Sequence, residues 1–344
     1  YIDRIKGDKA ENIELAIQFY KQALQVKTQE DFPQDWATTQ NNLGTAYYKR
    51  IKGDKAENIE LAIQSLNAAL QIKTQEDFPQ KWAVTQHNLG GVYSARIKGD
   101  KAENIELAIQ SYNDALQIRT QQAFPQEHVD TLSNLGIIYQ DAGIFDSAYT
   151  TYESAIATVE LLRGEIISGE ESKRKQAEEW DSLYSRMVEV CLELGETILA
   201  LEYVEKSKTR NLVELILERD YKIIFPPNVA TQLEQLRDEI VTGQYQIQNG
   251  TTENPTALAQ HLQGLREQKK SLENEYLPVG SGFDLKKFQS SLNDNTVVIE
   301  WYISYTDIET FIITSENIER FNFSKSFTWI DWADWSFNYL TAYY

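Results

Sequence analysis

The sequence predicts a mostly α-helical protein: a solenoid built as a superhelix of antiparallel helix pairs, then a helical hairpin, then a short β-meander that begins an α/β domain. First, the segment RIKGDKAENIELAIQ occurs three times without a substitution, beginning at Arg4, Arg50 and Arg96. The resulting 46-residue period is typical of solenoids, in which each unit buries its apolar face against its neighbours. Second, two apolar helical seams flank the turn-rich segment NGTTENPT, and third, β-branched and aromatic runs follow towards the end.

Each repeat unit contains two helical patterns. Asp54 followed by Glu57 is an N-cap with its capping-box partner, and apolar residues then recur at helical spacing as far as Leu70. The segment EDFPQ ends this helix, and Pro79 stands in the first turn of the next one, where a missing amide costs no hydrogen bond. The second helix is expected from about residue 81 to 94. One unit is therefore one antiparallel helix pair.

The string LGTAY beginning at Leu43, the alanines Ala62 and Ala69, and Pro79 together resemble a tetratricopeptide (TPR) repeat. The resemblance implies that the Leu-Gly string lies on the first helix of a pair and that the alanines let the second helix pack closely. The period exceeds the usual one of about 34 residues, chiefly through the segment IKGDKAEN. The unit after the third copy has the ordinary spacing, and a degenerate unit is expected at 180–207.

We expect four parts along the chain. The TPR array, whose first unit is truncated, is expected at 1–162, a degenerate unit with a connecting helix at 163–220, a helical hairpin at 221–280 and the N-terminal part of the α/β domain at 281–344. The hairpin is predicted because two leucine-rich segments of helical period enclose a turn-rich loop. The expected strands are 296–303 and 309–314, with a third candidate at 318–323.

The order of these parts is similar to that of bacterial proteins in which a TPR array precedes a CHAT domain, and CHAT domains resemble caspase-like cysteine peptidases. The resemblance rests on EKSKTRNL, beginning at Glu205, and on FQSSLNDNTVVIEWYISYTDIETFIIT, beginning at Phe288. It implies a catalytic His and Cys in strand-end motifs, which the remaining segment SKSFTWIDWADWSFNYLTAYY does not contain. We therefore expect no catalytic residue and no enzyme activity in this chain, which begins within a repeat and is expected to be a piece of a longer protein.

Composition argues against several classes of function. The formal net charge of −19 has the wrong sign for contact with nucleic-acid phosphates. No apolar run is long enough to span a bilayer, so no membrane partner is expected. The one cysteine, Cys191, is expected to be buried and unreactive and fits a reducing compartment, which predicts a cytoplasmic protein. The three histidines are not at metal-ligand spacing, so neither a metal nor a cofactor is expected.

A column of asparagines is the candidate binding site. Asn42, Asn88 and Asn134 each directly precede a Leu-Gly pair, one period apart. The string TLSNLGIIY, which ends at Tyr139, resembles kinesin-light-chain-like TPR repeats, and this resemblance implies that such asparagines line the concave groove and bind the backbone of an extended peptide. A carboxamide offers both a donor and an acceptor, which suits a peptide unit of any sequence. The supporting positions expected beside the column are Asn41, His87, Ser133 and Thr45.

The function expected from these residues is protein recognition: a peptide segment or partner protein binds in the groove, as the regulatory part of a CHAT peptidase. The alternative for the asparagines is that they tie adjacent helices together and persist only because the repeats are recent duplicates. Two alternatives for the whole chain also stay open. It is part of an active cysteine peptidase whose catalytic segment lies elsewhere, or it is a purely structural repeat array that associates with itself.

Overall fold

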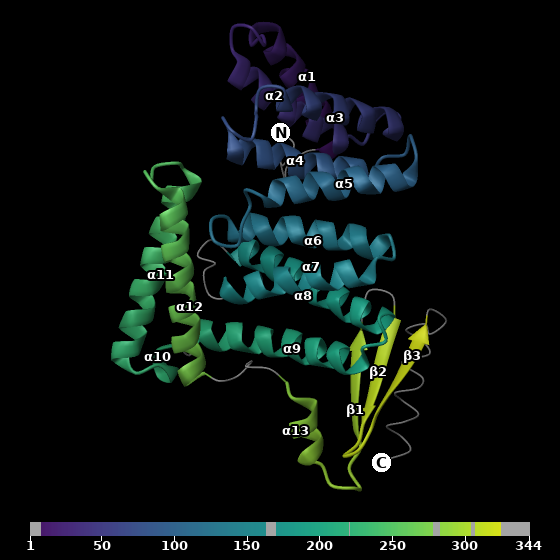
Figure 1. The fold of residues 1–344 in the computed structure, drawn as a ribbon, viewed down its shortest axis with the longest axis vertical. Coiled ribbons are helices and arrows are strands. Elements are labelled where there is room, and N and C mark those ends of the chain that lie inside the picture. Colours follow the sequence, from purple (N-terminus) through teal and green to yellow (C-terminus); the bar gives the residue numbers. More distant parts are fainter. Residues whose placement is uncertain (1–7, 163–169, 220, 278–282, 304–306, 325–344) are drawn as a thin grey trace. The chain divides into compact units, whose positions relative to one another are not determined.

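The computed structural model describes residues 8–162, 170–219, 221–277, 283–303 and 307–324. It confirms the predicted fold class: the described chain is mostly helical, its helices pack as consecutive pairs, and a small antiparallel sheet follows them (Figure 1). The chain divides into two compact units, which are Tyr1–Leu162 with Asp238–Glu267, and Arg163–Arg237 with Gln268–Tyr344. The expected division into four parts stays a prediction.

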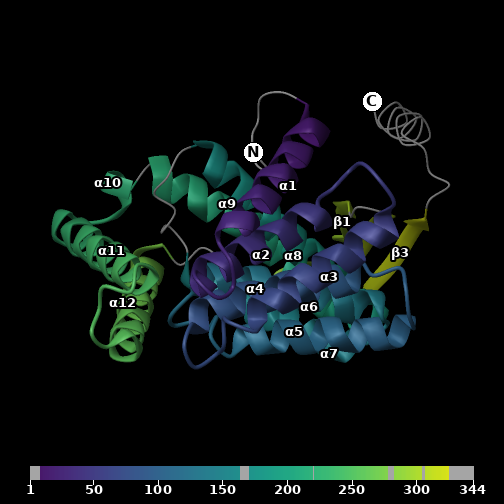
Figure 2. The same cartoon turned by 90° about the horizontal axis from the view of Figure 1, so that it is seen from above.

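The repeat array forms the larger part of the first unit. Its helices are α1 (Lys9–Val26), α2 (Pro33–Tyr48), α3 (Lys55–Leu70), α4 (Pro79–Ser94), α5 (Lys101–Leu116), α6 (Pro125–Asp141) and α7 (Phe145–Leu161). The pairs α2/α3, α4/α5 and α6/α7 have the most extensive helix contacts, and the second helix of each pair packs against the first helix of the next. Figure 2 shows these helices from above, with α2 to α7 stacked. The array is therefore a solenoid of helix pairs.

Helix starts follow the predicted chemistry. The carboxylate of Asp54 caps α3 by accepting a hydrogen bond of 2.8 Å from the backbone N–H of Glu57, and Asp100 caps α5 in the same way. Helices α2, α4 and α6 each begin with proline, whose missing N–H is one of the groups that has no helical partner. The start of α4 at Pro79 lies slightly before the predicted start at about residue 81. Local sequence thus sets where each helix of the array begins.

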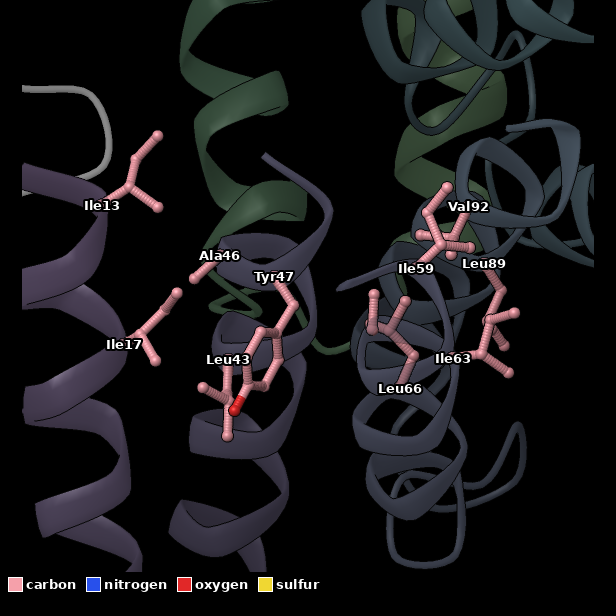
Figure 3. Close-up of a cluster of buried hydrophobic side chains, with 11 residues drawn as sticks. Ile13, Ile17, Leu43, Ala46, Tyr47, Ile59, Ile63, Leu66, Leu89 and Val92 are labelled. Atoms are coloured by element: carbon pink, nitrogen blue, oxygen red, sulfur yellow. The ribbon is translucent and has the colours of Figure 1, made fainter. Parts of the chain in front are cut away.

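One hydrophobic cluster joins the first four helices of the array (Figure 3). Ile13 and Ile17 of α1 lie towards Ala46 of α2, and Ile59 of α3 lies beside Val92 of α4. All of these side chains are buried. Because the cluster takes side chains from four helices, no single pair could bury it alone, as expected for a solenoid.

Glycine in each Leu-Gly pair lets the two helices of a unit approach closely. A Cβ at Gly44 would lie 2.7 Å from Leu66 Cγ, one at Gly90 would lie 2.8 Å from the Tyr112 ring, and one at Gly136 would lie 2.3 Å from the Tyr152 ring. Real Cβ atoms do not come this close to another heavy atom, so any larger residue would push the helices apart. The glycines are therefore a packing requirement.

Consecutive repeat units are joined by an arginine that binds a glutamate of the preceding unit and an asparagine of its own; we call this contact the arginine staple. Arg50 donates to both oxygens of Glu14 on α1 (2.7 and 2.8 Å) and to Oδ1 of Asn58 on α3 (3.2 Å). Arg96 repeats the arrangement in the next unit with Glu60 at 2.9 and 3.0 Å. Hydrogen bonding from Arg50 lowers the pKa of Glu14. Planar guanidinium-carboxylate pairs of this kind fix geometry as well as adding energy, which explains why the invariant segment contains both partners.

The hairpin is formed by α11 (Pro227–Gln248) and α12 (Pro255–Tyr276), as predicted. Its tip belongs to the first unit and lies on the loop before α6, where Ile247 and Leu262 pack with Phe124. Gln244 Nε2 donates to the backbone oxygen of Ala123 (2.9 Å), and Gln80 Nε2 donates to that of Ile247 (3.3 Å). The hairpin tip is thus a part of the array's packing.

The second of the two compact units contains the pair of helices α8 (Glu170–Glu193) and α9 (Thr197–Arg219). They occupy the place of the predicted degenerate repeat and pack together around a turn at Gly195. The short helices α10 (Tyr221–Ile224) and α13 (Leu285–Ser290) were not predicted as separate elements. The strands are β1 (Val298–Ile303), β2 (Asp307–Ile313) and β3 (Ile318–Ser324), so the third candidate strand is confirmed.

The sheet is a simple antiparallel meander in the order β1-β2-β3. Its register places Trp301 opposite Thr310 and Thr310 opposite Phe321. On the other face, buried Glu309 accepts hydrogen bonds from Arg320 at 2.8 and 2.9 Å and from Asn322. Lys208 of α9 forms an ion pair with Glu300 of β1, which ties the helices of this unit to its sheet.

Two glycine substitutions test the packing requirement. We expect Gly136→Ala to lower the free energy of unfolding by about 1 to 3 kcal/mol, because its Cβ would overlap the Tyr152 ring. Gly264→Ala, in α12, is the matched control: nothing lies within 4 Å of the added Cβ, so the better helix propensity of alanine should raise stability by roughly 0.5 to 1 kcal/mol. Urea unfolding followed by circular dichroism measures both, and equal signs would contradict the close-approach argument.

Candidate functional site

The candidate site lies on the first helices of three consecutive pairs. Helix α2 contacts α4, and α4 contacts α6. Asn42, Asn88 and Asn134 occupy equivalent positions on these helices, and all three are half-buried. We call this surface the α2–α4–α6 face. The predicted residues are thus brought onto neighbouring helices, but their contacts differ from one unit to the next.

Asn88 is occupied by contacts between repeats. Its Nδ2 donates to Asn41 Oδ1 (3.2 Å) and makes a longer contact with Thr45 Oγ1 (3.4 Å), both on α2. Asn41 in turn donates to Asn42 Oδ1 at 3.4 Å. At this junction the asparagine therefore ties adjacent helices together, as the alternative interpretation of the column predicts.

Asn134 has the same position on α6, but its potential partners have changed. His87 stands in place of Asn41 and Gly91 in place of Thr45. Glycine has no side chain to accept a hydrogen bond. No hydrogen bond to another described residue is present for the Asn134 side chain, and the same holds for Ser133. The Asn134 carboxamide therefore has its donor and acceptor groups available.

His87 is held in place by its own contacts. Its Nδ1 lies 3.1 Å from Thr131 Oγ1, and its ring meets the Tyr112 ring edge-on with the centroids 5.5 Å apart. The Thr131 hydroxyl donates to the Glu127 carbonyl (2.7 Å) and accepts from Arg119 (3.0 Å). Thr131 has one proton to give, so Nδ1 of His87 must carry the hydrogen of this contact, which leaves Nε2 as an acceptor. Burial, helped by the Arg119 charge, lowers the pKa of His87 to about 3.

Tyr112 brings a further polar group to the same place. Its ring crosses Gly90, and its hydroxyl would lie 3.4 Å from a Cβ added at Gly91. Burial raises the pKa of this phenol. The hydroxyl makes no hydrogen bond to another described residue, whereas the equivalent Tyr152 hydroxyl bonds Gln140 Oε1 at 2.9 Å. His87, Gly91 and Tyr112 lie together, and Asn134 is assigned to them because the equivalent Asn88 contacts Asn41 and Thr45; we call these four residues the Gly91 site.

The Gly91 site was only partly predicted. Asn134 and His87 were candidates, and Gly91 was expected at a concave position beside the column, but Tyr112 was not predicted. A comparison of the repeat units could have indicated this site. Asn41 and Thr45 are replaced by His87 and Gly91 in the next unit, whereas the asparagine that faces them, Asn88 or Asn134, is present in both cases.

Other candidate chemistry is not supported by a cluster of side chains. Cys191 is buried. Within the described residues, no group of three or more His, Cys, Asp and Glu side chains lies together in a way that could hold a metal ion. Over the same residues, the helices include none with the length and apolar character needed to cross a membrane.

Comparisons with known proteins add no family to this geometry: neither a set of protein-family models nor the curated proteins searched contains a match to the chain.

The neutral state of His87 predicts a dependence of stability on pH. The pKa of His87 is about 3 in the folded state against 6.5 as the ordinary value, so the unfolded chain takes up this proton first as the pH falls. The stability is therefore fully present above about pH 6.5 and is lost at about 1.4 kcal/mol per pH unit between pH 6.5 and 3.

We expect His87→Asn to remove this loss. The measurement is the free energy of unfolding of both proteins at pH 7, 6 and 5, with the difference between them cancelling the titration of the carboxylates. Curves that stay parallel over this range would contradict the assignment of a buried, neutral imidazole.

Proposed function

We propose that the α2–α4–α6 face binds an extended peptide segment, free or as part of a partner protein, and that Asn134 holds its backbone. One observation carries the proposal: the Asn134 carboxamide has no hydrogen-bond partner among the described residues, whereas the equivalent Asn88 uses its amide on α2. An unpaired carboxamide beside an open position is suited to binding, because it can donate to a peptide carbonyl and accept from a peptide N–H at once.

The neighbours of Asn134 support the same ligand. The Tyr112 hydroxyl is a donor or acceptor, and His87 Nε2 is an acceptor held in one tautomer by Thr131. Gly91 has no side chain, and among the other described parts of the chain only the Tyr112 hydroxyl lies within 4 Å of where its Cβ would be, so a ligand backbone could approach the helix here. Tyr112 is buried and the other three residues are half-buried, which reduces competition from water for their hydrogen bonds.

The wider role that we propose follows from the resemblance of the sequence. A peptide-binding TPR-type array that precedes a CHAT-like domain would act as the recognition part of a caspase-like peptidase in the cytoplasm. The helix pairs and the small sheet at the end of the described chain are compatible with such an order of parts. The catalytic residues would belong to a segment other than the one described.

Three variants test the role of Asn134. Peptides are first selected on the wild-type protein from a displayed library of random sequences, and their affinities are measured by fluorescence anisotropy. We expect Asn134→Ala to weaken binding at least about tenfold, because two hydrogen bonds are lost. The double variant His87→Asn with Gly91→Thr restores the partners that Asn88 has on α2, so it should occupy Asn134 and weaken binding as well.

Asn88→Ala is the matched control. We expect it to lower the free energy of unfolding by about 1 kcal/mol while leaving the peptide affinity within about twofold. Peptides that bind Asn134→Ala as tightly as the wild type, or a library that yields no peptide above background, would contradict the proposal.

A further inference from the structure

A column of cationic residues precedes the first helices of the pairs. Lys27, Lys73 and Arg119 occupy equivalent positions in the three loops, one period apart. The residue that faces each of them lies in the first turn of the following helix. These facing residues are Asp35 on α2, Lys81 on α4 and Glu127 on α6. Two of the three loops thus have an acidic partner and the middle one does not.

The outer two cations are balanced. Lys27 Nζ lies 2.8 Å from Asp35 Oδ2. Arg119 donates to Thr131 Oγ1 at 3.0 Å, and the charges of Glu127 and Asp130 oppose the effect of burial, which lowers the pKa of Arg119. Each of these two cations therefore faces an acidic residue of the following helix.

Lys73 is buried without a partner. Its residue is 4% exposed, and it forms neither a hydrogen bond nor an ion pair with another described residue. The charge that acts on it is that of Lys81, which has the same sign, and burial together with this charge lowers the pKa of Lys73 to about 8. Lys81 is itself near Asp35, whose pKa is lowered chiefly by Lys27 and slightly by Lys81. The Lys73 side chain is thus largely enclosed by protein, although no described anion offsets the cost of removing its charge from water.

The start of α4 adds to the positive potential. Its first turn contains no acidic residue and its N-cap makes no side-chain hydrogen bond, unlike α3 and α5. The backbone N–H groups of Gln80 and Lys81 make no hydrogen bond to another described group. Free N–H groups and the helix dipole favour an anion at this end of a helix.

We infer that Lys73, Lys81 and the first free N–H groups of α4 form a binding site for a carboxylate, and that an acidic peptide is its ligand. The carboxylate of Asp35 shows the arrangement: in the first unit it occupies the position that the ligand would take between the loop lysine and the first turn of the helix. We call this the Lys73 site. Although the net charge of the chain is −19, the charge at this one position is positive.

The Lys73 site is separate from Asn134 but lies along the same set of helices. On α4, the asparagine of the column is Asn88. It is nine residues after Pro79, the first residue of the helix, which corresponds to about 13 Å along the helix axis. The hairpin tip borders the site, since Gln80 donates to Ile247. The inference rests on the proposed function in one respect, which is that the carboxylate comes from a bound peptide.

The experiment uses the full chain and defined probes. Acetylated, amidated tetra-aspartate is titrated against the protein at low salt, with tetra-asparagine and inorganic phosphate as comparisons, and the lysine resonances are followed by NMR. We expect a saturable shift of the Lys73 resonance with tetra-aspartate, a rise in its pKa from about 8, and no effect of tetra-asparagine.

Variants separate this site from other cations. Lys73→Met should abolish binding of tetra-aspartate. Lys81→Asp should weaken this binding at least tenfold, because the new aspartate places a carboxylate where the first unit has Asp35. The same variant should also raise the melting temperature of the protein. Lys101→Met is the matched control, since Lys101 is exposed at the start of α5, after the opposite end of α4, and it should leave the affinity unchanged.

The absence of a saturable shift with tetra-aspartate, or a shift that survives in Lys81→Asp, would overturn the inference. Tighter binding of phosphate than of tetra-aspartate would assign the site to a free anion and overturn the peptide as its ligand. The proposed function is tested apart from this: library peptides that still depend on Asn134 while tetra-aspartate fails would remove the inference alone.

Discussion

The close approach of two helices at one glycine is the constraint on which the array depends. In each pair a large side chain of the second helix, Leu66 or Tyr112 in the first two full units, lies where the glycine of the first helix has no Cβ. This approach makes the pair a rigid unit that can be repeated, and the repeat then buries the cluster shared by α1 to α4. The same constraint also reaches the candidate site. A tyrosine that lies across Gly90 must bring its hydroxyl to the next position, Gly91, so packing within a pair delivers a polar group to the α2–α4–α6 face.

Contacts between units are of a second kind, and they explain the invariant segment. Arg50 reaches back to Glu14 in the preceding unit and forward to Asn58 in its own, and all three belong to copies of RIKGDKAENIELAIQ. A change in one copy would break a contact made by another, so the segment has to be kept as a set. After the third copy the position equivalent to Arg50 is Ala142, and the turn shortens to the ordinary spacing. The staple and the long turn therefore end together.

The helix pairs, their order and the strands could be predicted because local signals dominate them: an aspartate cap with its glutamate, a proline at the first position, and β-branched runs between turn residues. The contacts of the asparagine column could not. Asn88 and Asn134 have the same neighbours in the chain, Leu and Gly after them, yet one is paired and the other is free, because their partners lie 43 to 47 residues away on another helix. The burial of Lys73 was missed for a similar reason, since a lysine in a polar loop carries no local sign that the residue facing it is another lysine.

Near-identical repeats provide their own comparison, and the differences between them are not scattered. Helices α2 and α4 have equal length and differ at six positions. Five of these positions follow one another at spacings of three or four residues, which places them on one side of the helix. The five changes are Asp35 to Lys81, Thr38 to Val84, Asn41 to His87, Thr45 to Gly91 and Tyr48 to Ser94. Between α3 and α5 only two positions differ, and one of them is Leu66 to Tyr112. Random drift after duplication would spread over every exposed side of these helices. Instead the changes collect on one side of α4, where Lys81, Val84 and Ser94 are exposed and His87 and Gly91 are half-buried. Among the described residues, they remove the partners that Asn134 would have and the carboxylate that Lys73 would face. The first two full units therefore differ as a surface, and the positions that differ are those on which both proposed binding sites depend.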